Sequence, residues 1–130
     1  METKKLRTLA IEASTKAYSP YSKAFVGCAL TTSDGSIYTG CNIENASYGG
    51  TVCAERVAIF KAVSDKKMVV KQIYIYTLAG WPPCGMCRQV MSEFADADLE
   101  VIIGNETGEE TKIKFRDLMP LSFTPNHLQK

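Results

Sequence analysis

The sequence predicts a mixed α/β fold with five strands and a central βαβ unit, and two observations carry this prediction. First, a strand-prone run at residues 69–78 is followed by a helical segment at 84–94 and a short apolar strand at 99–103. The handedness rule for such crossovers lays the two strands parallel, with the helix across one face. Second, residues 25–41 have the pattern of an antiparallel hairpin. A sheet that contains both pairings is mixed.

The first predicted element is an amphipathic helix at residues 4–18. Apolar side chains recur at spacings of three and four, and charged side chains occupy the opposite face. Pro20 ends the helix, because a proline forces the residue before it out of helical geometry. The apolar face consists of Leu6, Leu9, Ala10, Ala13 and Ala17.

The predicted hairpin comes next and is followed by a polar segment. Residues 25–32 and 36–41 are β-prone, and Ser33-Asp34-Gly35 between them supplies turn chemistry. Residues 42–51, NIENASYGGT, are polar and rich in Asn and Gly. Binding residues concentrate on loops that a rigid scaffold positions. We therefore expect residues 42–51 to form a functional loop.

A second helix is predicted at residues 52–63, where apolar residues recur at helical spacing. After the strand at 69–78, Trp81-Pro82-Pro83 interrupts the chain before the next helix begins at Cys84. Residues 111–115 are expected to form an edge strand, and residues 116–119 a final helical turn. No repeat, low-complexity tract or linker is present, so residues 1–130 are expected to form a single domain.

Composition restricts the class of protein. Fifteen basic residues against 14 acidic residues leave a formal charge of +1, which provides no long-range field to attract nucleic acid or an anionic membrane. No apolar run approaches the roughly 20 residues needed to cross a bilayer. Five cysteines cannot all pair, and the N-terminal residues lack the pattern of a secretory signal. We therefore expect a reduced, cytoplasmic protein that binds neither nucleic acid nor membrane.

Three of the cysteines are placed like metal ligands. Cys53 stands at the start of one predicted central helix, and Cys84 and Cys87 stand at the start of the other. Three ligands are the number that a catalytic zinc site uses while it keeps a fourth position for water or substrate. Cys28 and Cys41 are not clustered with these three and are expected to be small buried residues.

Glu55 follows Cys53 by two residues, where a carboxylate would take a proton from water at the metal and deliver it to a substrate. Residues two apart face different ways on a regular helix, so this role requires Cys53 to lie at the splayed start of the helix. Three thiolates around one divalent cation leave a net negative charge. Arg56 is the first candidate to offset that charge, and Arg88 is the second, together with the positive ends of both helix dipoles.

These residues occupy the signature of the zinc deaminases, Cys-x-Glu followed by Pro-Cys-x-x-Cys. The chain resembles the small, all-cysteine, homotetrameric cytidine deaminases of the cytidine deaminase superfamily, and the resemblance covers almost its whole length. It implies a three-layer α/β/α cytidine deaminase-like fold. The matching segments are YSPYSKAFVGCAL, CNIENASYG, VCAERVAIFKAV, PPCGMCRQVM and RDLMPLSFTPNHL.

The resemblance implies a zinc-dependent hydrolysis of cytidine and deoxycytidine to uridine and deoxyuridine, with release of ammonia, in pyrimidine salvage. Cys53, Cys84 and Cys87 would hold one Zn²⁺ per subunit, and Glu55 would carry the proton. Asn42 and Glu44 would bind the ribose hydroxyls, and the backbone N–H of Ala54 would bind the base carbonyl. The resemblance also implies that neighbouring subunits of the homotetramer complete each pocket, with the donor residues Ala46, Tyr48 and Phe123.

One departure from the family concerns the aromatic residue that usually follows the position of Lys23 and stacks on the pyrimidine. Here Ala24 stands there and Phe25 follows it. Because strand side chains alternate, Phe25 is expected to point to the opposite face, unless the local register slips. Blasticidin S deaminases resemble the Tyr-Ser-x-Ala pattern, so an aminohydrolase of that cytosine-containing antibiotic is the alternative function.

Other interpretations stand beside this one. A lone Cys-x-x-Cys is also typical of a redox pair or of half a structural zinc site. A zinc-stabilised binding module and a deaminase of cytosine within RNA or DNA are two further classes, and the neutral charge argues against the second. The Trp-Pro-Pro turn leaves two roles for Trp81, packing and shaping the mouth of the pocket, and packing is the expected one. His127 is expected to be exposed without a function.

Overall fold

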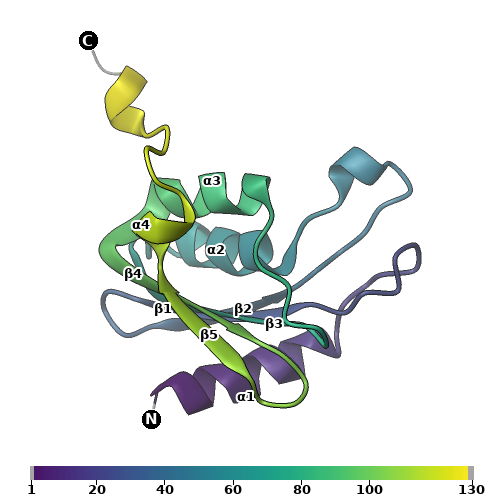
Figure 1. Cartoon of the computed structure of the whole chain (residues 1–130). Helices are drawn as coiled ribbons and strands as arrows, with labels where there is room; N and C mark the ends of the chain where they lie inside the picture. The colour runs from purple at the N-terminus through teal and green to yellow at the C-terminus, as the bar shows by residue number, and fades with distance from the viewer. Residues whose placement is uncertain (1, 129–130) are drawn as a thin grey trace.

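The computed structural model describes residues 2–128 and places five strands in one sheet, in the order β2-β1-β3-β4-β5 (Figure 1). The pair β3 and β4 is parallel, and every other neighbouring pair is antiparallel. The predicted mixed sheet with a central βαβ unit is therefore confirmed. The strands are β1 (Gly27–Thr32), β2 (Ile37–Cys41), β3 (Val70–Tyr76), β4 (Ala95–Gly104) and β5 (Glu110–Lys114).

Helices cover both faces of this sheet. Helix α1 (Glu2–Ser14) packs against one face, and α2 (Ala54–Ser64) and α3 (Gly85–Phe94) lie on the other (Figure 1). The three-layer α/β/α arrangement is as expected. The short helix α4 and the 3₁₀ turns η1 and η2 span Phe115–Leu118, Tyr48–Gly50 and Pro125–Leu128. Within residues 2–128, no helix is both long enough and apolar enough to span a membrane.

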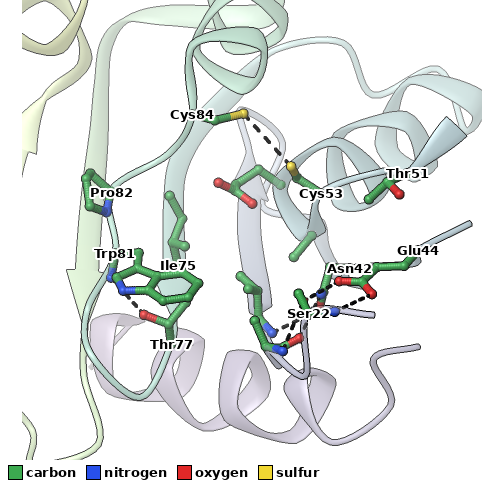
Figure 2. A pocket seen from close by; sticks show the side chains of 14 residues that line it. Ser22, Asn42, Glu44, Thr51, Cys53, Ile75, Thr77, Trp81, Pro82 and Cys84 are labelled. Atoms are coloured by element: carbon green, nitrogen blue, oxygen red, sulfur yellow. Dashed lines mark hydrogen bonds between the residues drawn. The ribbon is translucent and has the colours of Figure 1, made fainter. Parts of the chain in front are cut away.

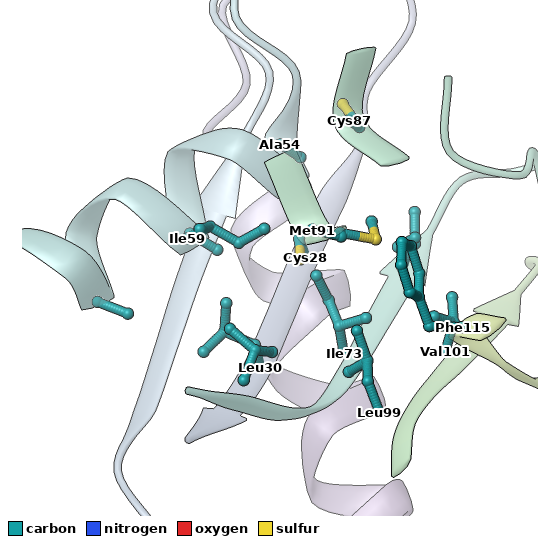
Figure 3. Close-up of a cluster of buried hydrophobic side chains, with 14 residues drawn as sticks. Cys28, Leu30, Ala54, Ile59, Ile73, Cys87, Met91, Leu99, Val101 and Phe115 are labelled. Carbon is teal, nitrogen blue, oxygen red and sulfur yellow. The ribbon is translucent and has the colours of Figure 1, made fainter. Parts of the chain in front are cut away.

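Alternating strand residues fill two separate cores, as the two-residue period of a strand requires. Ile73 of β3 lies in one buried cluster with Met91 of α3 and Ile59 of α2 (Figure 3), and Ile75 belongs to the same cluster. Tyr74, between Ile73 and Ile75 in sequence, points to the opposite face and packs with Leu6 of α1. Both faces of the sheet are thus sealed, which holds the strand ends in fixed positions.

Two glycines allow the helices to approach the sheet closely. A Cβ atom on Gly27 would lie 1.8 Å from the carbonyl oxygen of Ala10 in α1, and one on Gly40 would lie 2.5 Å from that of Ala54 in α2. Any larger residue at position 40 would push away the start of α2. Gly40 therefore sets the position of the helix start that follows Cys53.

The strand order brings both central helices to one edge of the sheet. Strands β2 and β3 both pair antiparallel with β1, so they run in the same direction and end at the same edge. Helix α2 follows β2 through the polar loop, α3 follows β3, and β1 starts at this edge. The starts of α2, α3 and β1 therefore meet there, although they lie far apart in the sequence.

The predicted length of the first helix was wrong. Helix α1 ends at Ser14 rather than at residue 18. The next three backbone N–H groups form tighter bonds to carbonyls three residues back. Tyr18 then leaves the helix and forms a parallel bridge with Ile43, donating its N–H to the carbonyl of Asn42 at 3.0 Å. Pairing with the polar loop thus competes with the last predicted turn.

The predicted strand at residues 99–103 was too short. Strand β4 begins at Ala95, directly after α3, and its first four residues include Asp96 and Asp98. Residues 95–98 alternate Ala and Asp, but both residue types are depleted in strands, so their composition does not favour a strand. The pairing with β3 places Ala95 opposite Val70, then shifts register and resumes with Glu100 opposite Gln72, so β4 reaches back to Ala95 across an irregularity.

Candidate active site

Two helix starts form the centre of the candidate site. Cys53 and Cys84 are the N-caps of α2 and α3, and both have extended backbone geometry, with ψ angles of 156° and 170°. Cys53 therefore lies at the splayed start that the role of Glu55 requires. The extended N-cap turns the Cys53 side chain toward the same cavity as the first turn of α2.

The cysteine cluster has the dimensions of a zinc site. The Sγ atoms of Cys53, Cys84 and Cys87 all lie within 4.8 Å of one another, and no other such group of possible ligands occurs in residues 2–128. The Sγ atoms of Cys53 and Cys84 are 3.9 Å apart. Tetrahedral coordination with Zn–S distances of about 2.3 Å separates two sulfur ligands by roughly 3.8 Å. The three thiols therefore fit a zinc ion.

The electrostatics of the cluster favour thiolate at Cys53. Its pKa is lowered to about 5, first by the hydrogen bond with Cys87 and then by Arg56, while the pKa of Cys87 is raised. Arg56 Nη2 lies 3.6 Å from Cys53 Sγ and 3.2 Å from the carbonyl oxygen of Thr51. Arg56 is thus placed to offset the charge of the cluster.

Arg88, the second candidate for this task, has a different set of contacts. Its Nε donates to the Pro83 carbonyl and its Nη1 to the Leu118 carbonyl, each at 2.9 Å. The expectation that Arg88 offsets the sulfur charge is therefore not supported by its hydrogen bonds. Arg88 instead ties the turn before Cys84 to the segment that follows α4.

Glu55 lies in the first turn of α2 and lines a cavity of about 240 Å³ together with Cys53 and Cys84. Only 4% of Glu55 is exposed. Burial disfavours the charged form of a carboxyl group and raises the pKa of Glu55 to about 7. A carboxyl group with a pKa near neutrality is suited both to accept and to donate a proton.

The polar residues Asn42 and Glu44 line the same cavity. Asn42 accepts the N–H of Val26 and donates to the carbonyl of Ala24, both at 2.9 Å. Glu44 accepts the N–H groups of Tyr21 and Ser22 at 2.9 and 3.1 Å, and the Ser22 hydroxyl also donates to it. These bonds, the Ser22 hydroxyl first, lower the pKa of Glu44. The chain thus holds both side chains in place and leaves each further hydrogen-bonding capacity.

The opposite wall of the cavity contains residues that sequence analysis did not assign to the site (Figure 2). Trp81 lines the cavity and is 55% exposed, so the expected packing role was wrong and the alternative role at the pocket is favoured. The Thr77 hydroxyl accepts the N–H groups of Gly80 and Trp81 at 2.8 and 2.7 Å and fixes this turn. No sequence motif marks such a turn anchor. The unassigned lining residues are Ser22, Ala24, Val26, Thr51, Ile75, Thr77, Trp81 and Pro82.

The three residues expected to come from neighbouring subunits lie outside this cavity. Ala46 is exposed in the polar loop, and Tyr48 is 73% exposed, with its ring 5.6 Å from that of Tyr21. Phe123 is 53% exposed and stacks on His127 at a centroid distance of 5.4 Å. His127 is exposed as expected, but it also accepts the Thr124 N–H at 2.9 Å.

The register at Ala24 and Phe25 is resolved. Ala24 lines the cavity that contains the cysteines, whereas Phe25 lines a neighbouring hollow and is 49% exposed. Asn42 holds residues 24 and 26 through their backbone, so no slip occurs between them. The methyl group of Ala24, in the segment that precedes β1, is thus what this position presents to the site.

Comparisons with known proteins agree with this geometry. Residues 1–103 match the family described as the cytidine and deoxycytidylate deaminase zinc-binding region. A cytidine deaminase from Halalkalibacterium halodurans is 48% identical over 126 residues, which cover 95% of this chain and 96% of the relative.

The crystal structure of cytidine deaminase from Burkholderia pseudomallei superposes with a TM-score of 0.90 at 41% identity, covering 95% of this chain and 100% of that one. A blasticidin-S deaminase from Bacillus cereus is 35% identical and covers 80% of each chain. This lower similarity favours cytidine deaminase over the alternative. The chain therefore belongs to the cytidine and deoxycytidylate deaminase family of zinc-binding hydrolytic deaminases.

Proposed function

We propose that this chain catalyses the zinc-dependent hydrolysis of cytidine and deoxycytidine to uridine and deoxyuridine, with release of ammonia. The observation that carries this proposal is the position of the buried Glu55 carboxyl group beside three clustered thiols, in a cavity of about 240 Å³. We propose further that residues 1–130 form one deaminase domain, which acts in cytoplasmic pyrimidine salvage.

Cys53, Cys84 and Cys87 would hold one Zn²⁺ per subunit, and their sulfur spacing supports this assignment. The bound ion supplies a Lewis acid that lowers the pKa of water to near neutrality. Three thiolates weaken that effect, because they leave the site with a net negative charge. Arg56, at 3.6 Å from Cys53 Sγ, offsets part of this charge.

Glu55 would carry the proton through the reaction. Its carboxylate accepts a proton from the attacking water and delivers it to N3 of the cytosine ring, as oxygen bonds to C4. It then carries the second water proton to the amino group, the C4–N bond breaks and ammonia leaves. Water and cytidine thus give uridine and ammonia. The raised pKa of Glu55 supports this exchange in both directions.

The substrate would lie between the loop at residues 42–51 and the start of α2. Asn42 and Glu44 would bind the ribose hydroxyls with the hydrogen-bonding capacity that their backbone contacts leave free. The first N–H groups of a helix have no partner within the helix, so the N–H of Ala54 is available for the base carbonyl.

We propose a homotetramer in which Ala46, Tyr48 and Phe123 reach the pockets of neighbouring subunits. Their exposure and their absence from the lining of the chain's own cavity support this assignment. Gln89 of α3 donates to the carbonyl of Phe123 at 2.9 Å, which orders the segment that would cross to a neighbour. Light scattering after size exclusion tests the assembly, since a stable monomer with full activity contradicts it.

One parallel assay tests the proposed reaction. Zinc-loaded protein is incubated with cytidine, deoxycytidine, deoxycytidine monophosphate and blasticidin S, and the loss of ultraviolet absorbance is followed for each. We expect rapid loss with the two nucleosides. No turnover of either nucleoside contradicts the proposal, and preferential turnover of blasticidin S supports the alternative antibiotic deaminase.

A further inference from the structure

A second hollow adjoins the cavity of the candidate site. Its volume is about 250 Å³, close to the 240 Å³ of the site itself. Four residues line this hollow but not the site: Lys23, Phe25, Leu78 and Ala79. Of these, only Lys23 carries a polar side chain. The residues that line both spaces are Ser22, Ala24, Val26, Thr77 and Trp81.

Ala24 stands at the boundary between the two spaces. Its backbone carbonyl is held by Asn42 and its N–H by the Ser22 hydroxyl at 3.1 Å, so the position of its Cβ is fixed. Lys23 before it adopts a positive φ of 62°, a turn that lets Ser22 and Ala24 line the same cavity. No side-chain atom of residue 24 beyond Cβ separates the site from the hollow.

If cytidine binds as in the proposed function, the hollow faces one particular edge of its base. The carbonyl, N3 and amino groups of cytosine face the N–H of Ala54, the carboxyl group of Glu55 and the cysteines. The ribose faces Asn42 and Glu44. The C5–C6 edge remains, and it carries no hydrogen-bonding group. Trp81, on the wall opposite the start of α2, is complementary to this edge (Figure 2), and Ala24 lines the same cavity.

We propose that the hollow is a subsite for an apolar substituent at C5 of the cytosine base. The enzyme then deaminates cytosine nucleosides whose 5-substituent is larger than methyl. Water adds at C4 and ammonia leaves as before, so the substituent is a spectator. Phe25 and Leu78 are 49% and 63% exposed, and a bound substituent covers apolar surface on both.

The test compares substrates of increasing size in the zinc-loaded full chain: cytidine, 5-methylcytidine, 5-propynylcytidine and 5-phenylcytidine. We expect kcat/KM for the two large substituents to stay within about tenfold of that for cytidine. In Ala79→Phe the hollow is filled at a residue that does not line the site. Its kcat/KM should fall at least about tenfold for the large substituents and stay unchanged for cytidine.

Two controls sharpen the test. Ala97→Phe adds the same bulk at an exposed position of β4 and should leave all substrates unchanged. Trp81 is the only tryptophan of the chain, so its fluorescence reports directly on the boundary of the hollow. Binding of 5-propynyluridine should change this emission more than binding of uridine, and Ala79→Phe should abolish the difference.

Three results would overturn the proposal. The first is normal turnover of cytidine with exclusion of both large 5-substituents, as occurs if a neighbouring subunit fills the hollow. The second is an Ala79→Phe variant in which the ratio of kcat/KM for the large 5-substituted substrates to kcat/KM for cytidine is unchanged. The third is acceptance of large substituents on the amino nitrogen but not at C5. Failure to deaminate cytidine at all is a different result, which contradicts the proposed function itself.

Discussion

Arg56 lies beside Cys53, with its Nη2 atom 3.6 Å from Cys53 Sγ, and both residues belong to the start of α2. A full positive charge next to a thiolate stabilises the thiolate in any protonation state of its neighbours. The same guanidinium also donates to the carbonyl of Thr51, which fixes its orientation. This pair links the charge of the cysteine cluster to the backbone of the polar loop.

Replacing Arg56 by Gln should therefore weaken metal binding. We expect a loss of about 10- to 100-fold in zinc affinity, the range seen when residues that support metal ligands are changed. Competition with a chromophoric chelator measures this affinity. Arg88→Gln is the matched control, since Arg88 contacts the carbonyls of Pro83 and Leu118 instead of a sulfur. Equal losses in both variants contradict the assigned role of Arg56.

Replacing Glu55 by Ala should leave zinc bound and nearly abolish turnover. Loss of a general acid–base group costs about 10²- to 10⁴-fold in rate, while the three cysteine ligands stay unchanged. Zinc content by atomic absorption and the rate of cytidine loss are the two measurements. Glu55→Gln keeps the size of the side chain and should be equally inactive. Substantial activity in either variant contradicts the proton-transfer role.

Replacing Ser22 by Ala should raise KM for cytidine with little change in kcat. Ser22 donates to Glu44 through its hydroxyl and its N–H, so its loss frees the carboxylate to move. We expect KM to increase about tenfold, because the free energy of one hydrogen bond to a charged group corresponds to a change of about this size. In a double-mutant cycle with Glu44→Ala, the effects should not add, because Ser22 acts through Glu44. Full additivity contradicts this role.

Tyr74 should make stability depend on alkaline pH. Its buried hydroxyl accepts from Arg7 at 2.9 Å and donates to Glu110 at 2.5 Å. Burial raises the pKa of Tyr74 to about 12, above the ordinary value near 10. The neutral form is favoured in the folded state, so its contribution is complete below pH 10 and disappears as the pH rises through 12.

The measurement is urea denaturation of wild type and Tyr74→Phe across this pH range. At pH 8 the variant should be less stable by about 1–2 kcal/mol, the effect of a lost buried hydrogen bond. The difference should shrink as the pH approaches 12. A constant difference from pH 8 to 12 contradicts the assignment.

Replacing Gly40 by Ala should destabilise the fold and weaken the zinc site together. The added Cβ would lie 2.5 Å from the Ala54 carbonyl oxygen and 2.6 Å from the Ala58 nitrogen, so α2 must shift. Overpacking of this kind costs about 1–3 kcal/mol. Gly49→Ala is the matched control, because a Cβ there meets nothing within 4 Å. Thermal unfolding and zinc affinity are measured for both variants, and unchanged zinc affinity in Gly40→Ala contradicts the coupling.

The cysteine cluster could be predicted from sequence partly through local spacing and partly through the zinc deaminase signature, which joins Cys53 to Cys84 across 31 positions. Cys84 and Cys87 are held near each other by a single turn of chain, and Glu55 follows Cys53 in the first turn of α2. Helix and strand types were also predictable, since apolar periodicity reflects which side chains must be buried. Element ends were less predictable. The end of α1 depends on pairing between Tyr18 and Ile43, which lie 25 positions apart.

The sequence by itself predicted the order of strands and helices and the local pair Cys84 and Cys87, because apolar periodicity and the spacing of one helical turn are local. Cys53 lies 31 positions before Cys84, and the zinc deaminase signature was needed to join it to the pair. Tertiary structure alone decided which residues face each other across the cavity. Ser22, Thr77 and Trp81 reach the site because the start of β1 lies beside the ends of β2 and β3 at one edge of the sheet. Such contacts follow from strand pairing between distant segments, and no local pattern encodes them.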